Sequence, residues 1–473
     1  MPKSISFIQS LVPVFVLMIL LTINILYKDG EWWGAYSNQL ILLVSGGVAF
    51  LLGLVYKVRL RKIATEIIEN LKSVLVPIII LAMVGALSGA WLISGIIPSM
   101  VYYGLSILSP EIFLPASVII SAIISIATGS SWTTTATVGI ALIGIGSAMG
   151  ISTGMIAGAV ISGAYFGDKM SPLSDTTNLA PAMAGTDLFT HIKYMTYTTI
   201  PSIVVTLIVF TILSFISPTN GEANTQQLLI DIESYFTITP WLFLVPGVVV
   251  VLILLKLKPI LSLLVGVLLA LIFAVVFQPQ IIGSVHGITH VSELMAKVIF
   301  TEYEIETKNE LLNELFVSKG VIGMLWTILL IISAMIFGGI MDGVGALSKI
   351  TEVLLKKAKS VFGLFASTVA SCIGLNAIAS DQYLAIVIPG KMYKSAFEKR
   401  GLAPENLSRT LEDSGTVTSV LVPWNTCGAY QSSVLGVGVG EYFFFAVFNW
   451  LSPIVTLAFA YFRIKIRTLN SKL

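Results

Sequence analysis

Residues 167–178 carry two carboxylates between long apolar segments. They read Gly-Asp-Lys-Met-Ser-Pro-Leu-Ser-Asp-Thr-Thr-Asn, and the preceding residues 151–166 are apolar and rich in small side chains. Ionisable groups at membrane depth are costly, so Asp168 and Asp175 are expected to be functional or paired. Pro172 prevents a continuous helix and leaves backbone carbonyls without helical partners. Carboxylates, hydroxyls and free carbonyls are oxygen ligands for a small hard cation, so this stretch predicts an ion site.

A similar group of residues occurs near the end of the chain. Glu412 and Asp413 are followed by hydroxyl side chains and then by Pro423 and an Asn-Thr pair. Both segments therefore offer acids, hydroxyls, a proline and an amide within apolar surroundings. We expect Asp175 and Asp413 to bind Na⁺ and the proton. Asp168 and Glu412 would support or replace them.

Two further polar runs interrupt apolar segments. Residues 128–137 read Thr-Gly-Ser-Ser-Trp-Thr-Thr-Thr-Ala-Thr, and residues 376–382 read Asn-Ala-Ile-Ala-Ser-Asp-Gln. A single Thr in an apolar helix usually bonds a carbonyl of its own helix. Two such breaks in equivalent places instead favour a pair of helical hairpins that line a site. The further ligands expected from these segments and the acidic ones are Ser130, Thr133, Thr176, Asn178, Asp381, Ser414, Thr416, Asn425 and Thr426.

These residue types predict how the site works. A carboxylate in a low-dielectric site tends to hold a proton unless a cation stabilises its charged form. Cation and proton then compete for the same oxygens, and a protein in which one of them crosses in each direction is an antiporter. A passive cation channel is the alternative of another class, and it needs no titrating carboxylate. A membrane enzyme is more remote, and an ATP-driven pump is disfavoured because the chain lacks a phosphate-binding Gly-Lys-Ser/Thr loop.

The composition indicates the elements that must hold these residues. Of the 473 residues, 56% are hydrophobic and only 11% are charged, against about 25% in a soluble protein. We therefore expect an all-α, polytopic membrane protein. The apolar runs that predict spans are 9–27, 38–56, 74–96, 111–129, 151–167, 193–217, 239–255, 259–277, 321–345, 361–380, 404–423 and 441–463.

The charges between the spans predict an orientation. Lys and Arg gather in residues 57–62 and 463–467, among other short segments, and such segments face the cytoplasm. The acid-rich segments 218–238 and 278–320 are then external loops. This places both termini in the cytoplasm. His286 and His290 have the i, i+4 spacing of a metal pair, but no third ligand is evident.

That orientation predicts an internal repeat. Residues 1–217 and 239–473 each contain two helices, a third helix, a surface helix, a returning run, a polar crossing and a last helix. The returning runs are 111–148 and 361–393. The first copy begins inside and the second outside, which is the inverted-topology repeat of many secondary transporters, with the site between broken helices. The alternative is that the helices alternate by accident.

The chain resembles the NhaC family of bacterial Na⁺/H⁺ antiporters. The resemblance rests on residues 167–178, 128–133, 380–382, 412–415 and 423–427. It implies a multi-pass protein of the bacterial cytoplasmic membrane that exchanges Na⁺, with Li⁺ as a second candidate, for H⁺. It also implies a homodimer in which hairpin-bearing domains move against a scaffold formed by the first two helices of each copy.

The same family includes proteins that look like malate/lactate antiporters, which import malate with protons and export Na⁺ with lactate. A dicarboxylate needs basic side chains or helix N-termini aimed at it. Near the predicted site the chain offers only Lys169 and Arg409, both expected at the cytoplasmic edge. We therefore expect a bare cation as substrate, with malate and lactate as the runner-up. The expected partners are the lipid bilayer and small cations, with no cofactor and no nucleic acid.

Overall fold

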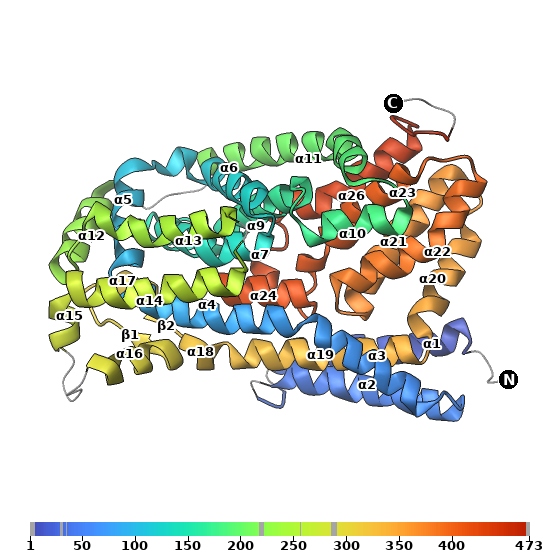
Figure 1. Ribbon diagram of the computed structural model, residues 1–473, viewed down its shortest axis with the longest axis horizontal. Coiled ribbons are helices and arrows are strands. Elements are labelled where there is room, and N and C mark those ends of the chain that lie inside the picture. Colours follow the sequence, from blue (N-terminus) through green and yellow to red (C-terminus); the bar gives the residue numbers. More distant parts are fainter. Residues whose placement is uncertain are drawn as a thin grey trace.

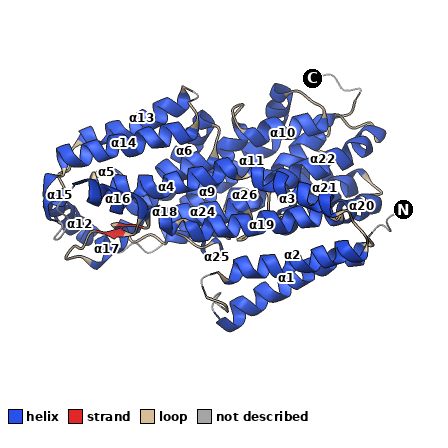
Figure 2. Cartoon of the chain, turned by 60° about the horizontal axis from the view of Figure 1, so that its bottom comes forward, coloured by secondary structure: helices blue, strands red, loops and turns tan. Residues whose placement is uncertain are grey.

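The computed structural model describes residues 5–28, 32–34, 36–216, 222–255, 257–284 and 291–469. These residues are almost entirely helical, with one antiparallel pair of short strands, β1 (Tyr303–Glu304) and β2 (Val317–Ser318), near α16 and α17 (Figure 2). Within the described part, eight helices are long and apolar enough to cross a membrane. The predicted all-α, multi-pass membrane class is confirmed. His286 and His290 lie outside the described residues.

The first half of the chain supplies one hairpin and one broken helix. The helices are α1 (Phe7–Lys28), α2 (Ser37–Val55), α3 (Leu60–Ser73), α4 (Leu75–Ile93), α5 (Ile96–Ile107), α6 (Pro110–Thr128), α7 (Ser131–Thr134), the π-helical turn η1 (Thr135–Gly139), α8 (Ile140–Ala148), α9 (Thr153–Met170), α10 (Asp175–Ala184) and α11 (Leu188–Ile216). The hairpin is α6–α7, and the broken helix is α9–α10.

The second half supplies the other hairpin and the second acidic crossing. Its elements are α12 (Glu222–Tyr235), η2 (Pro240–Phe243), α13 (Leu244–Leu254), α14 (Pro259–Phe277), α15 (Pro279–Ser284), α16 (Val291–Phe300), α17 (Glu310–Leu315), α18 (Gly320–Gly323), α19 (Leu325–Gly343), α20 (Ala346–Lys357), α21 (Val361–Ile378), α22 (Gln382–Lys399), α23 (Pro404–Leu411), η3 (Glu412–Thr416), η4 (Ser419–Leu421), α24 (Thr426–Leu435), α25 (Val439–Tyr442) and α26 (Val447–Tyr461). The hairpin is α21–α22, and the π-helical turn η3 carries the acids.

Three segments expected as loops contain helix. The basic segment 57–62 leads into α3, which runs with α4 as a single candidate span, Leu60–Ile93. Helix α3 packs closely on α19, where a Cβ at Gly343 would lie 2.8 Å from the Cα of Ile63. The predicted external loops 218–238 and 278–320 contain α12 and α15 to α17. Short helices with charged faces do not show the long apolar runs that predict spans.

The two predicted hairpins turn in the same way. Gly129, with a φ of +71°, ends α6, and the Ser130 side chain then caps α7 by accepting a hydrogen bond from the Thr133 amide at 3.2 Å. Ser380, with a φ of +59°, follows α21, and Asp381 caps α22 by accepting from the Leu384 amide at 2.9 Å. A left-handed residue followed by a capping side chain reverses the chain tightly. The inverted relation of residues 1–217 to residues 239–473 stays a prediction.

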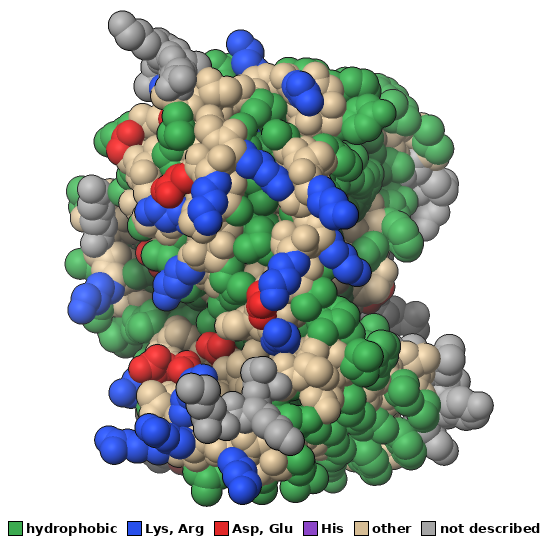
Figure 3. Space-filling view, turned by 90° about the vertical axis from the view of Figure 1, so that its right-hand side faces the viewer, with side chains coloured by type: hydrophobic (Ala, Val, Ile, Leu, Met, Phe, Trp, Pro, Cys, Tyr) green, Lys and Arg blue, Asp and Glu red, His purple; other side chains and the backbone are tan. Residues whose placement is uncertain are grey.

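Figure 1 shows helices along the bottom, the top and the right-hand end of the molecule. In Figure 1, α2, α3 and α19 run side by side along the bottom, and α11 crosses the top. The hairpin α21–α22 and α20 stand at the right-hand end, near both chain termini. Many Lys and Arg side chains cover the face at this end (Figure 3), and α20 and α22 contribute exposed Lys356, Lys357, Lys391 and Lys399.

Helix α9 packs against α6 through two glycines. A Cβ at Gly163 would lie 2.2 Å from the carbonyl oxygen of Val118, and one at Gly167 would lie 2.4 Å from that of Ala122. Residues four apart share a helix face, and such small pairs allow close helix contact in membranes. This contact fixes the end of α9, and with it Asp168, beside the helix that leads into the first hairpin.

Gly167→Val is expected to prevent the accumulation of folded protein, because the new side chain would meet the backbone of α6. The measurement is the yield of a single symmetrical peak in size-exclusion chromatography after detergent extraction. Gly47→Ala in α2 is the matched control, since a Cβ there meets nothing within 4 Å. A normal yield of the Gly167→Val protein would contradict this packing.

Candidate functional site

A cavity of about 620 Å³ lies where the broken elements meet. It is lined by the tips of both hairpins, the break between α9 and α10, the start of α4 and the α13–α14 turn. The N-terminal ends of α7, α10, α22 and α24 all contribute to its wall. Free amide groups at helix N-termini create a positive potential, which stabilises acidic side chains and anions nearby.

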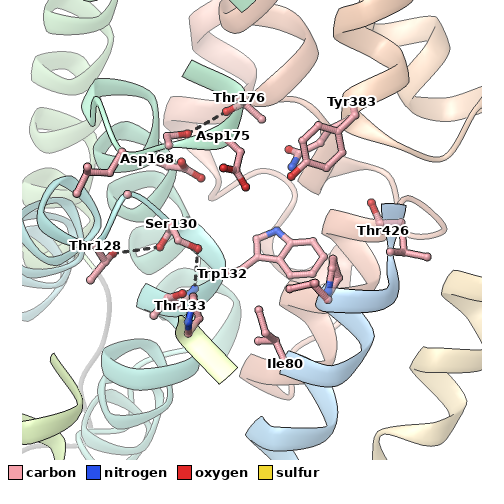
Figure 4. Close-up of a pocket in the computed structure, with 18 of the residues that line it drawn as sticks. Ile80, Thr128, Ser130, Trp132, Thr133, Asp168, Asp175, Thr176, Tyr383 and Thr426 are labelled. Atoms are coloured by element: carbon pink, nitrogen blue, oxygen red, sulfur yellow. Dashed lines mark hydrogen bonds between the residues drawn. The ribbon is translucent and has the colours of Figure 1, made fainter. Parts of the chain in front are cut away.

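Three of the predicted acids face this cavity: Asp168, Asp175 and Asp381. The amide and hydroxyl of Ser131 donate to Oδ2 of Asp168 at 3.0 and 2.7 Å. Asp175 is the first residue of α10, and its side chain is exposed to the cavity. In Figure 4 the carboxylates of Asp168 and Asp175 face the same space, with Tyr383 across from them. The first hairpin, α6–α7, therefore holds the Asp168 carboxylate through Ser131, while the Asp175 carboxylate is accessible to a ligand in the cavity.

The predicted neutral ligands fall into two groups. Ser130, Thr133, Thr176 and Thr426 line the cavity together with the acids. The others are not among the lining residues: Asn178, Ser414, Thr416 and Asn425. Asn178 instead holds the α9–α10 break, because its amide donates to the carbonyls of Pro172 at 3.0 Å and Ser174 at 2.7 Å. Asn425 caps α24, accepting from the Cys427 amide at 3.0 Å.

Asp413 lies away from the cavity in a buried ion pair with Lys169. Both side chains are completely shielded from solvent. Three hydroxyls complete the surroundings of Asp413: Thr198 donates at 2.8 Å, Ser452 lies at 3.4 Å, and Thr456 also donates. The Na⁺ site expected between Asp175 and Asp413 is therefore not assembled in this structure, because a lysine already neutralises Asp413.

Lys169 and Arg409 were expected at the cytoplasmic edge, and both are fully buried. Lys169 also donates to the hydroxyl of Ser452 at 3.2 Å and lies over the ring of Phe448, while Arg409 stacks on the ring of Tyr194. Neither basic side chain lines the cavity. Among the described residues, no guanidinium or ammonium group lines the cavity wall.

Glu412 lies outside the cavity and is linked by a hydrogen bond to Thr176, which lines it. Its Oε1 accepts from the hydroxyl of Thr176 at 3.0 Å, and its side chain is fully buried. Glu412 and Asp413 are neighbours in the chain, yet Glu412 contacts α10 and Asp413 contacts α9, α11 and α26. The π-helical turn η3 carries both acids, and such turns are frequent at functional sites.

The structure adds residues to the cavity that sequence reasoning missed. Trp132 and Tyr383 supply aromatic walls, and Ile80 on α4 supplies an apolar one (Figure 4). Trp132 stacks on Tyr430 with 3.9 Å between ring centroids. Trp132 and Tyr383 follow the predicted turns, so their positions in the chain were a usable signal. The sequence contains no such signal for Ile80, because this residue lies in a uniformly apolar run.

The described carboxylates do not surround a cation on their own. Among the described residues, no three His, Cys, Asp or Glu side chains lie close enough to hold a metal ion together. A cation in the cavity would thus be held by one or two carboxylates with hydroxyls and carbonyls. Such mixed oxygen ligands suit a weakly held, transported ion.

Broken helices that meet at an acidic cavity, in a chain of membrane-length helices, define the architecture of a secondary transporter. A model of the Na⁺/H⁺ antiporter family matches residues 163–464, and the chain belongs to this family. The resemblance to NhaC proteins is confirmed.

Three curated relatives cover most of the chain. The Na⁺/H⁺ antiporter NhaC of Alkalihalophilus pseudofirmus is 40% identical over 414 residues, which are 88% of each chain. NhaC of Bacillus subtilis is 38% identical over 84% of this chain and 86% of its own length. The malate-2H⁺/Na⁺-lactate antiporter of Bacillus subtilis is 37% identical over 88% of this chain and 86% of its own length. These relatives are antiporters, and their names include both predicted substrate classes.

Proposed function

We propose that this protein exchanges Na⁺, and also Li⁺, for H⁺ across the bacterial cytoplasmic membrane. The observation that carries the proposal is the cavity wall, which combines three aspartates with hydroxyls and contains no Lys or Arg among its described residues. Asp175 is the principal cation ligand, Asp168 and Asp381 assist it, and Ser130, Thr133 and Thr426 complete the oxygen set.

The proposed exchange follows from charge. A cavity with several carboxylates and no basic side chain attracts cations and protons alike. A bound proton neutralises the same oxygens that a Na⁺ needs, so each ion weakens the binding of the other. If the site can change the side of the membrane that it faces only when it holds Na⁺ or a proton, the movement of Na⁺ in one direction is coupled to the movement of protons in the other.

The proposed orientation follows from the charged end of the molecule. The face in Figure 3, which carries α20 and α22, is rich in Lys and Arg, and both termini lie at this end. Basic segments stay in the cytoplasm during membrane insertion. We therefore place both termini inside, with α12 and α15 to α17 outside.

The second candidate is exchange of malate with protons for Na⁺ with lactate, as in the name of one relative. The cavity volume of about 620 Å³ favours it, because pockets for small organic ligands measure roughly 300–1,000 Å³. The N-termini of α10 and α22 could also bind a carboxylate through backbone amides. The three aspartates oppose a dicarboxylate, which is why Na⁺/H⁺ exchange is preferred.

The test is proton movement in proteoliposomes that contain a pH-sensitive dye. An imposed pH gradient is challenged with Na⁺, Li⁺ or K⁺, each with and without malate and lactate. Na⁺ alone is expected to collapse the gradient. Proton movement that begins only when an organic acid is present would replace this proposal with the malate/lactate one. Proton movement without any Na⁺ gradient or organic acid would indicate a leak.

A further inference from the structure

We propose that the cavity also binds small primary alkylammonium ions, with the ammonium group against the aspartates and the alkyl chain against an apolar wall. The inference rests on the cation site of the proposed function and names a second class of cation for it. Three features of the cavity support it: the division of its wall between polar and apolar elements, its volume, and the sign of its charge.

One wall of the cavity is polar and acidic. The tips of both hairpins and the break between α9 and α10 supply Asp168, Asp175 and Asp381, with hydroxyl side chains beside them. Carboxylate and hydroxyl oxygens accept hydrogen bonds, whereas a primary ammonium group has three N–H donors and no acceptor. The exposed side chain of Asp175 is accessible to such a group. This wall therefore suits an ammonium ion as well as Na⁺.

The other wall is formed by the start of α4 and by the turn between α13 and α14. Every lining residue that the structure describes in these two segments is apolar: Val74, Val76, Pro77, Ile80, Ile253, Leu257 and Pro259. A Na⁺ ion needs oxygen ligands and gains nothing from such a surface. An alkyl chain is stabilised there because it leaves water. This wall is therefore suited to the apolar part of a ligand.

Aromatic rings lie beside both walls. In the view of Figure 4, the ring of Trp132 lies between the Asp175 carboxylate and Ile80. The ring of Tyr383 lies across from Asp175. Trp132 is held by stacking on Tyr430, with 3.9 Å between ring centroids. Aromatic rings cover alkyl groups and attract cations at their faces, so they suit a ligand with a charged end and a short apolar chain.

The volume and the charge of the cavity agree on the class of ligand. Its volume of about 620 Å³ lies within the range of pockets for small organic molecules, roughly 300–1,000 Å³. Its three aspartates oppose an anion, and no Lys or Arg lines it in the part of the chain that the structure describes. The size therefore favours an organic ligand, and the charge favours a cation.

The first test measures how well amines displace bound ²²Na⁺ from the purified wild-type protein at one fixed pH. The series runs from methylammonium to pentylammonium. Each methylene that becomes buried should raise the affinity about two- to fourfold, so pentylammonium should displace Na⁺ at least about tenfold better than methylammonium. Pentan-1-ol has the same alkyl chain without the charge and is expected to displace nothing. Equal displacement by methylammonium and pentylammonium, or displacement by pentan-1-ol, would overturn the inference.

The second test changes only the apolar wall. Ile80→Thr places a hydroxyl in that wall and is expected to lower the advantage of pentylammonium over methylammonium at least about threefold. A general loss of affinity does not affect this readout, because it compares two amines in the same protein. Ile79→Thr is the matched control, since Ile79 is 46% exposed and is not among the lining residues. An unchanged advantage in Ile80→Thr, or the same loss in Ile79→Thr, would overturn the inference.

Direct binding of ¹⁴C-pentylammonium separates this inference from the proposed Na⁺/H⁺ exchange. If ²²Na⁺ binds saturably and ¹⁴C-pentylammonium does not, the inference fails and the proposed exchange stands. If ¹⁴C-pentylammonium binds saturably, loses this binding in Asp175→Asn, and ²²Na⁺ does not bind, the alkylammonium site is supported and the Na⁺ proposal is contradicted.

Discussion

Lys169→Met is expected to lower the free energy of unfolding by about 3–5 kcal/mol, because it leaves Asp413 buried without a cation. Both partners of this ion pair are fully shielded from solvent. The hydroxyls of Thr198 and Thr456 would remain hydrogen-bonded to Asp413, but they carry no charge to balance it. The measurement is the midpoint of thermal unfolding in detergent, followed by fluorescence-detected size-exclusion chromatography.

Two further variants make this prediction specific. Lys169→Met combined with Asp413→Asn removes both charges, and we expect it to recover most of the lost stability. Lys356→Met breaks an exposed pair with Glu352, in which the lysine side chain is 69% exposed, and should change stability by less than about 1 kcal/mol. A Lys169→Met protein as stable as the wild type would show that the buried pair does not hold α9 to η3.

Asp175→Asn is expected to abolish Na⁺-dependent proton movement in proteoliposomes while leaving the fold intact. Asp175 is the cavity acid that is exposed, and within the described residues no basic side chain forms an ion pair with it. An amide keeps the size of the carboxylate but carries neither the negative charge that binds Na⁺ nor a titrating proton. Activity should therefore fall to that of empty liposomes at every pH.

Asp187→Asn is the matched control for this variant. Asp187 lies before α11 outside the cavity, and hydrogen bonds from the hydroxyl and amide of Thr190 hold the pKa of its carboxyl below the usual range. It is therefore charged at neutral pH, so the control also removes one negative charge. Asn caps helices as well as Asp does, and transport should be unchanged. Equal activity of Asp175→Asn and wild type would move the cation site elsewhere.

Much of the fold could be predicted because a membrane protein encodes it locally. Long apolar runs predicted the helices, and the polar breaks at Gly129 and Ser380 predicted the hairpin turns. Pro172 predicted the interruption between α9 and α10. These signals depend on a few consecutive residues. Segments with mixed polarity, such as α3, were taken for loops because their apolar faces are short.

The sequence could not predict which acids face the cavity and which contact buried partners on other helices. Asp168 and Lys169 are adjacent, yet one faces the cavity and the other binds Asp413, 244 positions later in the chain. Glu412 and Asp413 diverge in the same way. Which side of a helix meets which neighbour depends on tertiary packing between distant segments. Single hydroxyls such as Thr198 look the same in sequence whether they bond their own helix or a buried carboxylate.

We propose that the cavity binds Na⁺ in competition with protons. Equilibrium binding of ²²Na⁺ to the purified wild-type protein, measured from acidic to alkaline pH, tests this competition. We predict saturable binding whose affinity rises with pH, because each carboxylate must lose its proton before it can hold the cation. The same measurement on Asp175→Asn should show no saturable binding. Affinity that is independent of pH would show that Na⁺ and protons do not compete, and affinity that survives Asp175→Asn would show that Asp175 does not hold the cation.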